Sequence, residues 1–249
     1  MENHDGRSWP PFYHVKENAR AKRVILRVRP ETGLVLTVPK GFNPRHIPRI
    51  LHHHRDWIEK ALAGIEDRCR TFRRPDILPQ SIFLKAVNTT WAVVYGPGSV
   101  KTLELTWTHR PPRLQLQGDV SQVPACCRLL RRWLREEAKR VLTPWVHVVA
   151  RRTGLSWARV RITTPQTRWG SYSSRGTVSL NAALLFLPPE LVEMVIIHEL
   201  CHSRHSRHDS AFWRLLARHQ PDYAQLDAAL KHAQDHLPLW YLASFMSKP

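Results

Sequence analysis

The spacing of apolar residues predicts a β-rich first half of the chain that contains one helix. Short apolar or alternating runs bounded by glycine and proline are typical of strands. Such runs occur at 24–28, 34–38, 82–87, 91–95, 103–107 and 113–117. The first two predict a hairpin and the last four a small antiparallel sheet. Between them, Pro44 begins a predicted helix that runs to about Ile65.

The second half has the longer spacing of amphipathic helices. Residues 121–152 carry apolar side chains at helical intervals, and Pro144 predicts a kink or boundary within them. Runs at 166–172 and 177–180, on either side of a polar stretch that ends in Gly176, predict a second hairpin. A nearly all-round apolar helix follows, and the last helices are short.

We therefore expect an α+β protein in two parts. A β-rich N-terminal region at 1–120 precedes a second domain at 121–249, which combines a small mixed or antiparallel sheet with helices.

The apolar helix that begins near Pro189 contains the sequence His198-Glu199-Leu200-Cys201-His202. Residues four apart lie on one face of a helix, so both imidazoles can bind one metal ion. Glu199 projects from the adjacent side and can reach a water on that metal without being a ligand. Buried histidines and a buried glutamate are costly unless a metal and its water satisfy them. The run thus predicts a metal-dependent hydrolase.

The third metal ligand must come from further along the chain. No glutamate follows Glu199, so a later glutamate does not complete the site. The remaining candidates are His205, His208, Asp209, His219 and Asp222. On a continuous helix His205 would lie roughly 10 Å beyond His198, too far to share an ion. His208 can turn back if the helix ends between 203 and 207, with Asp209 or Ser210 capping the next helix, so we favour His198, His202 and His208.

The run His52-His53-His54 is a second histidine cluster, within the first predicted helix. Consecutive helical side chains point about 100° apart and do not converge on one ion. We interpret this run as a solvated or packing face.

Charge and cysteine content limit the partners and the compartment. The chain carries 38 Lys+Arg against 20 Asp+Glu, a net charge of +18, which attracts polyanions. The basic residues are scattered without a recognised nucleic-acid motif, so specific nucleic-acid binding is not favoured. Four cysteines without C-x-x-C spacing predict neither a disulfide framework nor a second zinc site, but a cytoplasmic protein. No signal peptide and no run of 18 apolar residues is present, so we expect no membrane partner.

The segment before the apolar helix, taken together with that helix, resembles a known family. Arg168-Trp169-Gly170-Ser171 and Ser179-Leu180-Asn181, followed by the His-Glu-x-x-His run, His208 and Phe212-Trp213, closely resemble the YgjP-like metallopeptidase family. The resemblance is dense over residues 160–235. It implies a zincin-type domain with zinc on His198, His202 and His208 and with Glu199 as general base and acid. At Tyr172 the family commonly has cysteine.

The resemblance also leaves alternatives for the substrate. The family is grouped with metallopeptidases by motif, and a metal-dependent nucleoside triphosphate pyrophosphatase activity is attributed to it as well. The predicted hairpin can hold an extended peptide by strand addition, or offer Arg168 to a phosphate; otherwise Arg168 and Trp169 only pack the sheet edge. We expect a zinc-dependent metallopeptidase, with another divalent metal as the alternative ion, and substrate contacts from Arg168, Trp169 and Gly170. A UTP-type pyrophosphohydrolase and a non-enzymatic nucleic-acid-binding module are the alternative functions.

Overall fold

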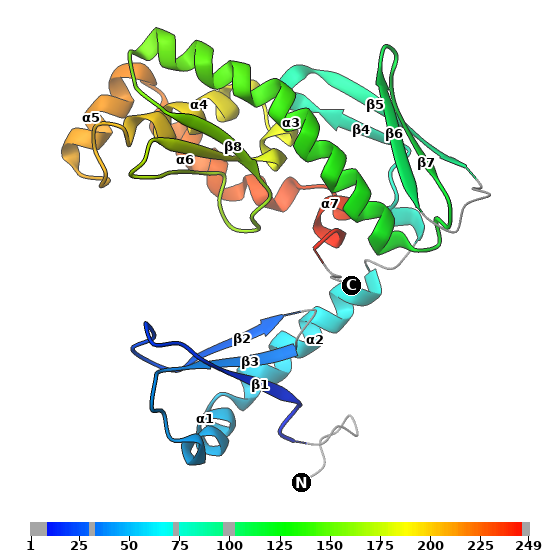
Figure 1. Cartoon of the computed structure of the whole chain (residues 1–249), viewed down its shortest axis with the longest axis vertical. Coiled ribbons are helices and arrows are strands. Elements are labelled where there is room, and N and C mark those ends of the chain that lie inside the picture. The colour runs from blue at the N-terminus through cyan, green and yellow to red at the C-terminus, as the bar shows by residue number, and fades with distance from the viewer. Residues whose placement is uncertain (1–8, 30–32, 72–74, 97–102, 246–249) are drawn as a thin grey trace. The chain divides into compact units, whose positions relative to one another are not determined.

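The structure, a computed structural model, describes residues 9–29, 33–71, 75–96 and 103–245 and divides the chain into two compact units (Figure 1). Unit 1 comprises residues 1–77 with 245–249, and unit 2 comprises residues 78–244. The sequence suggested a boundary near residue 120 instead. In the structure the strands at 81–117 belong with the long helix that follows them, because Trp91 packs edge-to-face on Trp133 of that helix.

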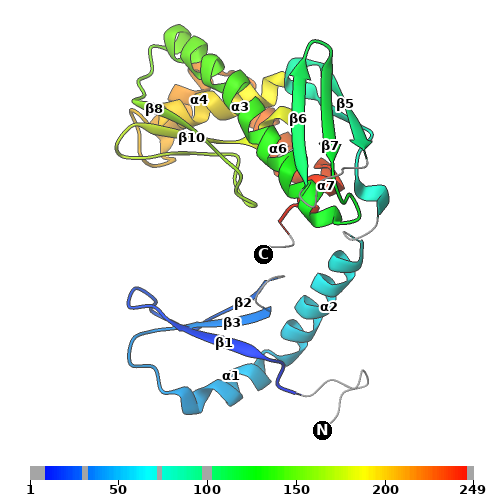
Figure 2. The same ribbon diagram turned by 45° about the vertical axis from the view of Figure 1, so that its right-hand side comes forward.

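Unit 1 is a three-stranded sheet covered by helices on one face (Figures 1 and 2). Its elements are β1 (Tyr13–Glu17), β2 (Ile25–Arg29), β3 (Gly33–Val38), a 3₁₀ turn (Pro44–His46), α1 (Ile47–His53), α2 (Arg55–Thr71) and a 3₁₀ turn (Pro75–Ile77). The strand order is β1-β3-β2, with β1 parallel and β2 antiparallel to β3. The predicted hairpin is therefore confirmed in its strands, while Glu31 and Thr32 of its turn lie outside the described residues.

Alternation along β3 builds the core of unit 1. Leu34, Leu36 and Val38 share one face and pack against Ile47, Leu51 and Ile58 of the two helices. The single helix predicted over 44–65 is divided at His54, whose backbone leaves the helical region with φ −105° and ψ 17°.

Unit 2 begins with a four-stranded sheet that lies beside α3 (Figure 2). Its elements are β4 (Ser81–Leu84), a 3₁₀ turn (Lys85–Val87), β5 (Thr89–Gly96), β6 (Glu104–His109) and β7 (Pro112–Gln117). The order is β4-β5-β7-β6, and β5 runs parallel to β7. The predicted strands are confirmed, but the prediction of a purely antiparallel sheet is wrong. The hairpin of β6 and β7 inserts its second strand next to β5, which forces that pair to be parallel.

The helix α3 (Val123–Thr153) agrees with the expected amphipathic segment. Pro144 lies inside it without ending it, and Gly154, in the left-handed region at φ 67°, terminates it. Leu130, Leu134 and Leu142 lie on its buried side.

The rest of unit 2 combines a second small sheet with short helices. Its elements are β8 (Arg159–Thr163), β9 (Gly170–Tyr172), β10 (Thr177–Asn181), a 3₁₀ turn (Ala182–Phe186), α4 (Pro189–Cys201), α5 (Ser210–His219), α6 (Tyr223–His232), a 3₁₀ turn (Ala233–His236) and α7 (Leu239–Ala243). The order β8-β10-β9 confirms the predicted second hairpin as the antiparallel pair β9 and β10, with β8 parallel to β10. Strand β9 lies at an edge of this sheet.

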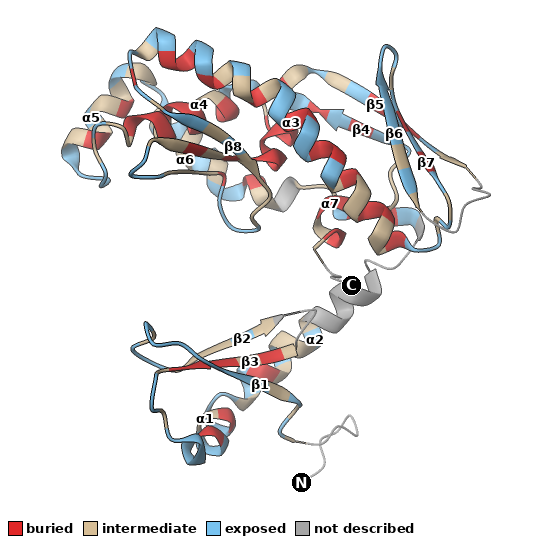
Figure 3. Ribbon diagram, viewed as in Figure 1, coloured by how far each residue is buried: buried red, intermediate tan, exposed pale blue. Residues whose placement is uncertain are grey.

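Buried residues are concentrated along α4 and one side of α3 (Figure 3). The expected mixture of helices and strands is thus present, with several small sheets in place of one large one. Within the described part of the chain, every helix is too short or too polar to cross a lipid bilayer.

Candidate metal centre

Helix α4 places the first two histidines at its C-terminal end. The helix begins after Pro188 and is apolar around nearly its whole circumference, so that it is buried in unit 2. His198 lies in its last turn and His202 is its C-cap residue, still in the right-handed helical region. Their rings are therefore neighbours, with centroids 5.3 Å apart.

A short polar segment after His202 brings His208 back to the helix. Asp209 ends this segment, and its carboxylate accepts a hydrogen bond of 2.9 Å from the Phe212 amide at the start of α5. The Trp213 indole donates to the His208 carbonyl at 3.1 Å. With this anchoring, one ring nitrogen from each of His198, His202 and His208 lies within 4.8 Å of the others.

The orientation of the rings is fixed by their neighbours. His202 Nδ1 is 2.9 Å from the carbonyl oxygen of His205, and since a carbonyl only accepts, Nδ1 carries the proton and Nε2 is left for a metal. Nε2 of His208 and Nε2 of His198 face each other at 3.0 Å. The ring of Phe212, fully buried, lies against the three imidazoles with centroid distances of 5.0, 4.8 and 4.6 Å.

The three imidazoles fit a zinc ion. Tetrahedral zinc with bonds of about 2.0–2.1 Å to nitrogen separates its ligands by roughly 3.3 Å, close to the observed spacing of the facing nitrogens. Burial, together with the proximity of His202 and His208, lowers the pKa of His198 to about 4, so this ring is neutral and able to coordinate at pH 7. A set of three protein ligands leaves one coordination position open, as in catalytic zinc sites.

Glu199 directly follows His198 in α4, and its side chain lies against strand β9. Its side chain is only 6% exposed, and burial raises its pKa to about 8 despite the opposing charge of Arg168. A Cβ atom added to Gly170 would lie 2.5 Å from Glu199 Oε1, so only glycine allows this close approach. A divalent cation bound nearby would lower the pKa of this carboxyl again and favour its ionised form.

A family model matches most of the chain. The model of the family described as "YgjP-like, metallopeptidase domain" matches residues 22–233. The chain belongs to the YgjP-like metallopeptidase family. This confirms the resemblance drawn from residues 160–235 and supports a metal-dependent hydrolase.

The chain was also compared with solved structures and with curated proteins. Among solved structures, the zymogen of the metallopeptidase abylysin from Pyrococcus abyssi is 25% identical, with a TM-score of 0.34, over 36% of this chain and 91% of its own. A search of curated proteins finds no match.

In this YgjP-like chain, Asn181 fixes the loop that leads into β9. Its amide nitrogen donates to the carbonyls of Pro165 and Arg168 at 3.0 and 2.9 Å. Its amide oxygen accepts from the Ala183 backbone at 3.0 Å and from the Tyr241 hydroxyl at 3.2 Å. Asn181 is 4% exposed, so these bonds are made in a buried setting where an unpaired partner is costly.

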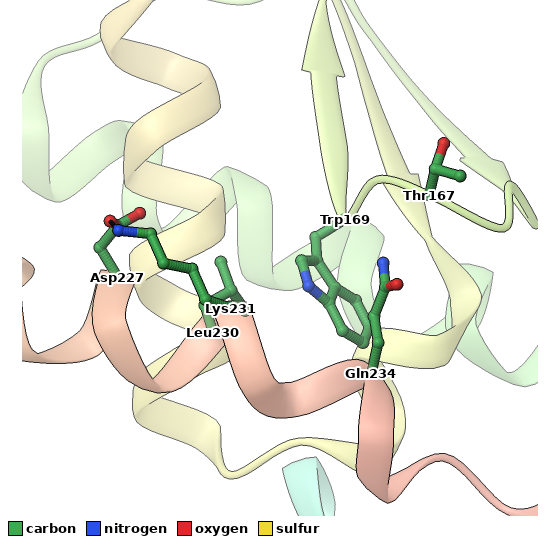
Figure 4. Close-up of a pocket in the computed structure, with 6 residues that line it drawn as sticks. All are labelled: Thr167, Trp169, Asp227, Leu230, Lys231 and Gln234. Atoms are coloured by element: carbon green, nitrogen blue, oxygen red, sulfur yellow. Dashed lines mark ion pairs between the residues drawn. The ribbon is translucent and has the colours of Figure 1, made fainter.

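A pocket of about 330 Å³ lies between the segment that leads into β9 and the helix α6 (Figure 4). It is lined by Thr167, Trp169, Asp227, Leu230, Lys231 and Gln234. Trp169 immediately precedes Gly170, which adjoins Glu199, and the charge of Asp227 opposes the lowering of the His198 pKa. Asp227 is paired with Lys231 at 2.9 Å.

The predicted substrate-contact residues and the alternative metal ligands lie in different places. Arg168 is exposed, Trp169 lines the pocket and Gly170 adjoins Glu199. Asp209 caps α5 as expected, and His205 contributes its carbonyl rather than its ring. Neither His219 nor Asp222 joins the cluster found among the described residues. Tyr172, the departure from the family pattern, donates its hydroxyl to the Ser156 carbonyl at 3.1 Å and ties β9 to the loop between α3 and β8.

Sequence reasoning missed the residues that α6 contributes to the pocket. Asp227, Leu230 and Lys231 are three and four positions apart, which gives a common helical face but no chemical signature. Only the packing of α6 against α4 brings them to the pocket, so no local signal identifies them.

Proposed function

We propose that the protein is a zinc-dependent metallopeptidase in which Glu199 is the general base and acid. The observation that carries this proposal is the convergence of three imidazole nitrogens within 4.8 Å of one another. The buried carboxyl of Glu199, the residue next to His198, lies against Gly170 of the edge strand β9 and supports the proposal. A site of this kind can act on a carbonyl of an extended chain that lies along β9.

The histidines and Glu199 have different roles in the proposed reaction. His198, His202 and His208 would hold the zinc ion, which when bound lowers the pKa of a water to near 7 and polarises a substrate carbonyl. Glu199 accepts the proton of that water and later delivers it to the leaving amine. Phe212, beneath the imidazoles, excludes water from their inner side.

Strand β9 supports a peptide as the substrate. It pairs with β10 through Gly170, Ser171 and Tyr172, and among the described residues no strand covers its other edge. The ladder continues beyond the strand, where the backbone N–H of Asn181 donates to the Trp169 carbonyl at 2.8 Å. An extended peptide can add to this edge by backbone hydrogen bonds, which would place its carbonyls beside Glu199.

The pocket between α6 and the segment that leads into β9 supplies a subsite for a substrate side chain. The Trp169 ring and Leu230 give it apolar walls, while the Asp227–Lys231 pair neutralises its charges. Its volume of about 330 Å³ accommodates a large side chain. We therefore expect cleavage next to bulky, uncharged residues.

The experiment compares the zinc-loaded wild type with Glu199→Gln on an unfolded protein and on UTP. Glu190→Gln, an exposed position on the same helix, is the matched control. We expect proteolysis by the wild type and the control, a loss of at least about 10³-fold in Glu199→Gln, and equal zinc content in the three. Glu199-dependent release of phosphate from UTP without proteolysis would replace this proposal with a nucleotide hydrolase. Activity that survives Glu199→Gln would refute both.

A further inference from the structure

Within the described part of unit 1, the helices α1 and α2 pack against only one face of the sheet. The strand register divides its side chains between two faces, because directly paired residues point to the same side. Leu34, Leu36 and Val38 point to the helices, as do Tyr13, Leu26 and Val28, which pack against the same cluster. The alternate positions form the opposite surface, which we call the open sheet face.

Three rows of residues cross the open sheet face. The first row contains Phe12 and Gly33. The second contains His14, Val35 and Arg27, and the third contains Lys16, Thr37 and Ile25. The face therefore has small or apolar residues along its centre, with basic residues on both sides. Glu17, the acidic residue of β1, points to the other side because it pairs with Val38.

An exposed aromatic ring stands at one end of this face. Phe12 is 80% exposed, and its ring is held edge-on by His14 with centroids 4.9 Å apart. Because its row neighbour Gly33 has no side chain, the ring of Phe12 has no cross-strand side chain beside it. Among the described residues, Phe12 is the most exposed large hydrophobic residue.

The connection between β1 and β2 extends the positive charge beyond the other end. Arg20, Lys22 and Arg23 lie there, all exposed, next to the row that contains Lys16. Strands of five residues span about 17 Å, so cations are spread along the full length of the face. This spacing suits a chain of regularly repeated negative charges.

We propose that the open sheet face of unit 1 binds single-stranded nucleic acid. The basic residues on both sides contact the phosphates, and Phe12 stacks on a base. A single strand is the occupant favoured here, because its unpaired bases expose the ring faces that an aromatic residue on a flat sheet can stack against. The acidic groups of a polypeptide would satisfy the cations but would leave Phe12 without a partner. This surface is built from residues of unit 1 and the metal centre from residues of unit 2, and the proposal does not depend on the peptidase activity.

The test measures fluorescence anisotropy of a labelled single-stranded 12-mer with the full chain in excess EDTA. With about four phosphate contacts, affinity should fall about 50-fold between 50 and 200 mM salt. Lys16→Ala combined with Arg27→Ala should weaken binding and reduce that salt effect to about 7-fold. Phe12→Ala should weaken binding at least about 5-fold with an unchanged salt effect, since it removes stacking only.

Matched variants on the helical side of unit 1 are the controls. Arg49→Ala with Lys60→Ala removes two exposed cations from α1 and α2, and Trp57→Ala removes an aromatic side chain that is 47% exposed on α2. These should leave binding within about twofold of the wild type. Equal losses in the control variants, tighter binding of polyglutamate or of a duplex of the same length, or no effect of Phe12→Ala would each overturn the proposal.

Discussion

The chain has two histidine clusters, and they differ in almost every physical respect. His52, His53 and His54 are consecutive, lie at the junction of α1 and α2, and are all exposed. His198, His202 and His208 are spread along the sequence, yet their ring nitrogens converge within 4.8 Å. The density of histidines is therefore a poor guide to a metal centre.

The surroundings explain the difference. In the second cluster a carbonyl fixes the tautomer of His202, an indole anchors the segment that carries His208, and Phe212 packs beneath the rings. Nothing comparable is described around the first cluster, where His53 and His54 contact each other edge-on. Convergence thus depends on a hydrogen-bonded, apolar frame as much as on the spacing of the ligands.

The largest effect should come from removing one member of each cluster. His208→Ala removes a ligand and should lower zinc affinity at least about 100-fold, whereas His53→Ala should leave it unchanged. Competition with a chromogenic chelator measures both. Equal zinc affinity in the two variants would contradict the assignment of His208.

The second prediction concerns the stability of the metal-free chain as a function of pH. Because the pKa of Glu199 is raised from 4.5 to about 8 on folding, the folded state retains a proton and the wild type loses stability as the pH rises through this window. The Glu199→Gln side chain cannot ionise. Between pH 5 and pH 8 the free energy of unfolding of this variant should therefore rise, relative to that of the wild type, by on the order of 3 kcal/mol.

Urea unfolding in excess EDTA measures this difference. His198 contributes equally to both chains, so its own titration cancels. Glu190→Gln should follow the wild type at every pH. If the free energies of unfolding of wild type and Glu199→Gln differed by the same amount at every pH, the pKa of Glu199 would not be raised by folding.

The third prediction concerns Asn181, which holds the loop that leads into β9, rather than the metal ligands. Asn181→Ala leaves the carbonyls of Pro165 and Arg168 without their donor and should cost about 2–3 kcal/mol of folding free energy. It should also reduce peptidase activity by releasing the segment that leads into β9. Thermal unfolding and zinc titration distinguish this from ligand loss, because zinc stoichiometry should stay unchanged. A fall in stoichiometry would instead place Asn181 in the support of the metal ligands.

The smallest effect is expected at Gly170. Its replacement by alanine places a methyl group against the Glu199 carboxyl, which must move, at a cost of about 1–2 kcal/mol and with a reduced kcat. Gly64→Ala is the control, since a Cβ there meets no atom within 4 Å and helical alanine is favoured over glycine. Denaturant midpoints and kinetics of the two variants provide the test. If Gly170→Ala retains full activity, Glu199 does not work from its observed position.

Local patterns predicted the second hairpin, the long helix and the convergence of His198, His202 and His208, because each rests on spacing within a short segment. They did not predict strand β1, whose side chains are mostly polar and exposed, since it is paired only through contact with the distant β3. The parallel pairing of β5 with β7 and the contribution of α6 to the pocket were missed for the same reason. Long-range pairing leaves no periodicity in the sequence.

The three imidazoles all come from the single stretch 198–208, which has a consequence for the apoprotein. A metal that joins such near neighbours closes only a small ring, so the loop entropy it removes from the unfolded chain is modest. Demetallation should accordingly be a local event. Amide hydrogen exchange should accelerate in the segment that carries His208 while the interior of α3 keeps its protection.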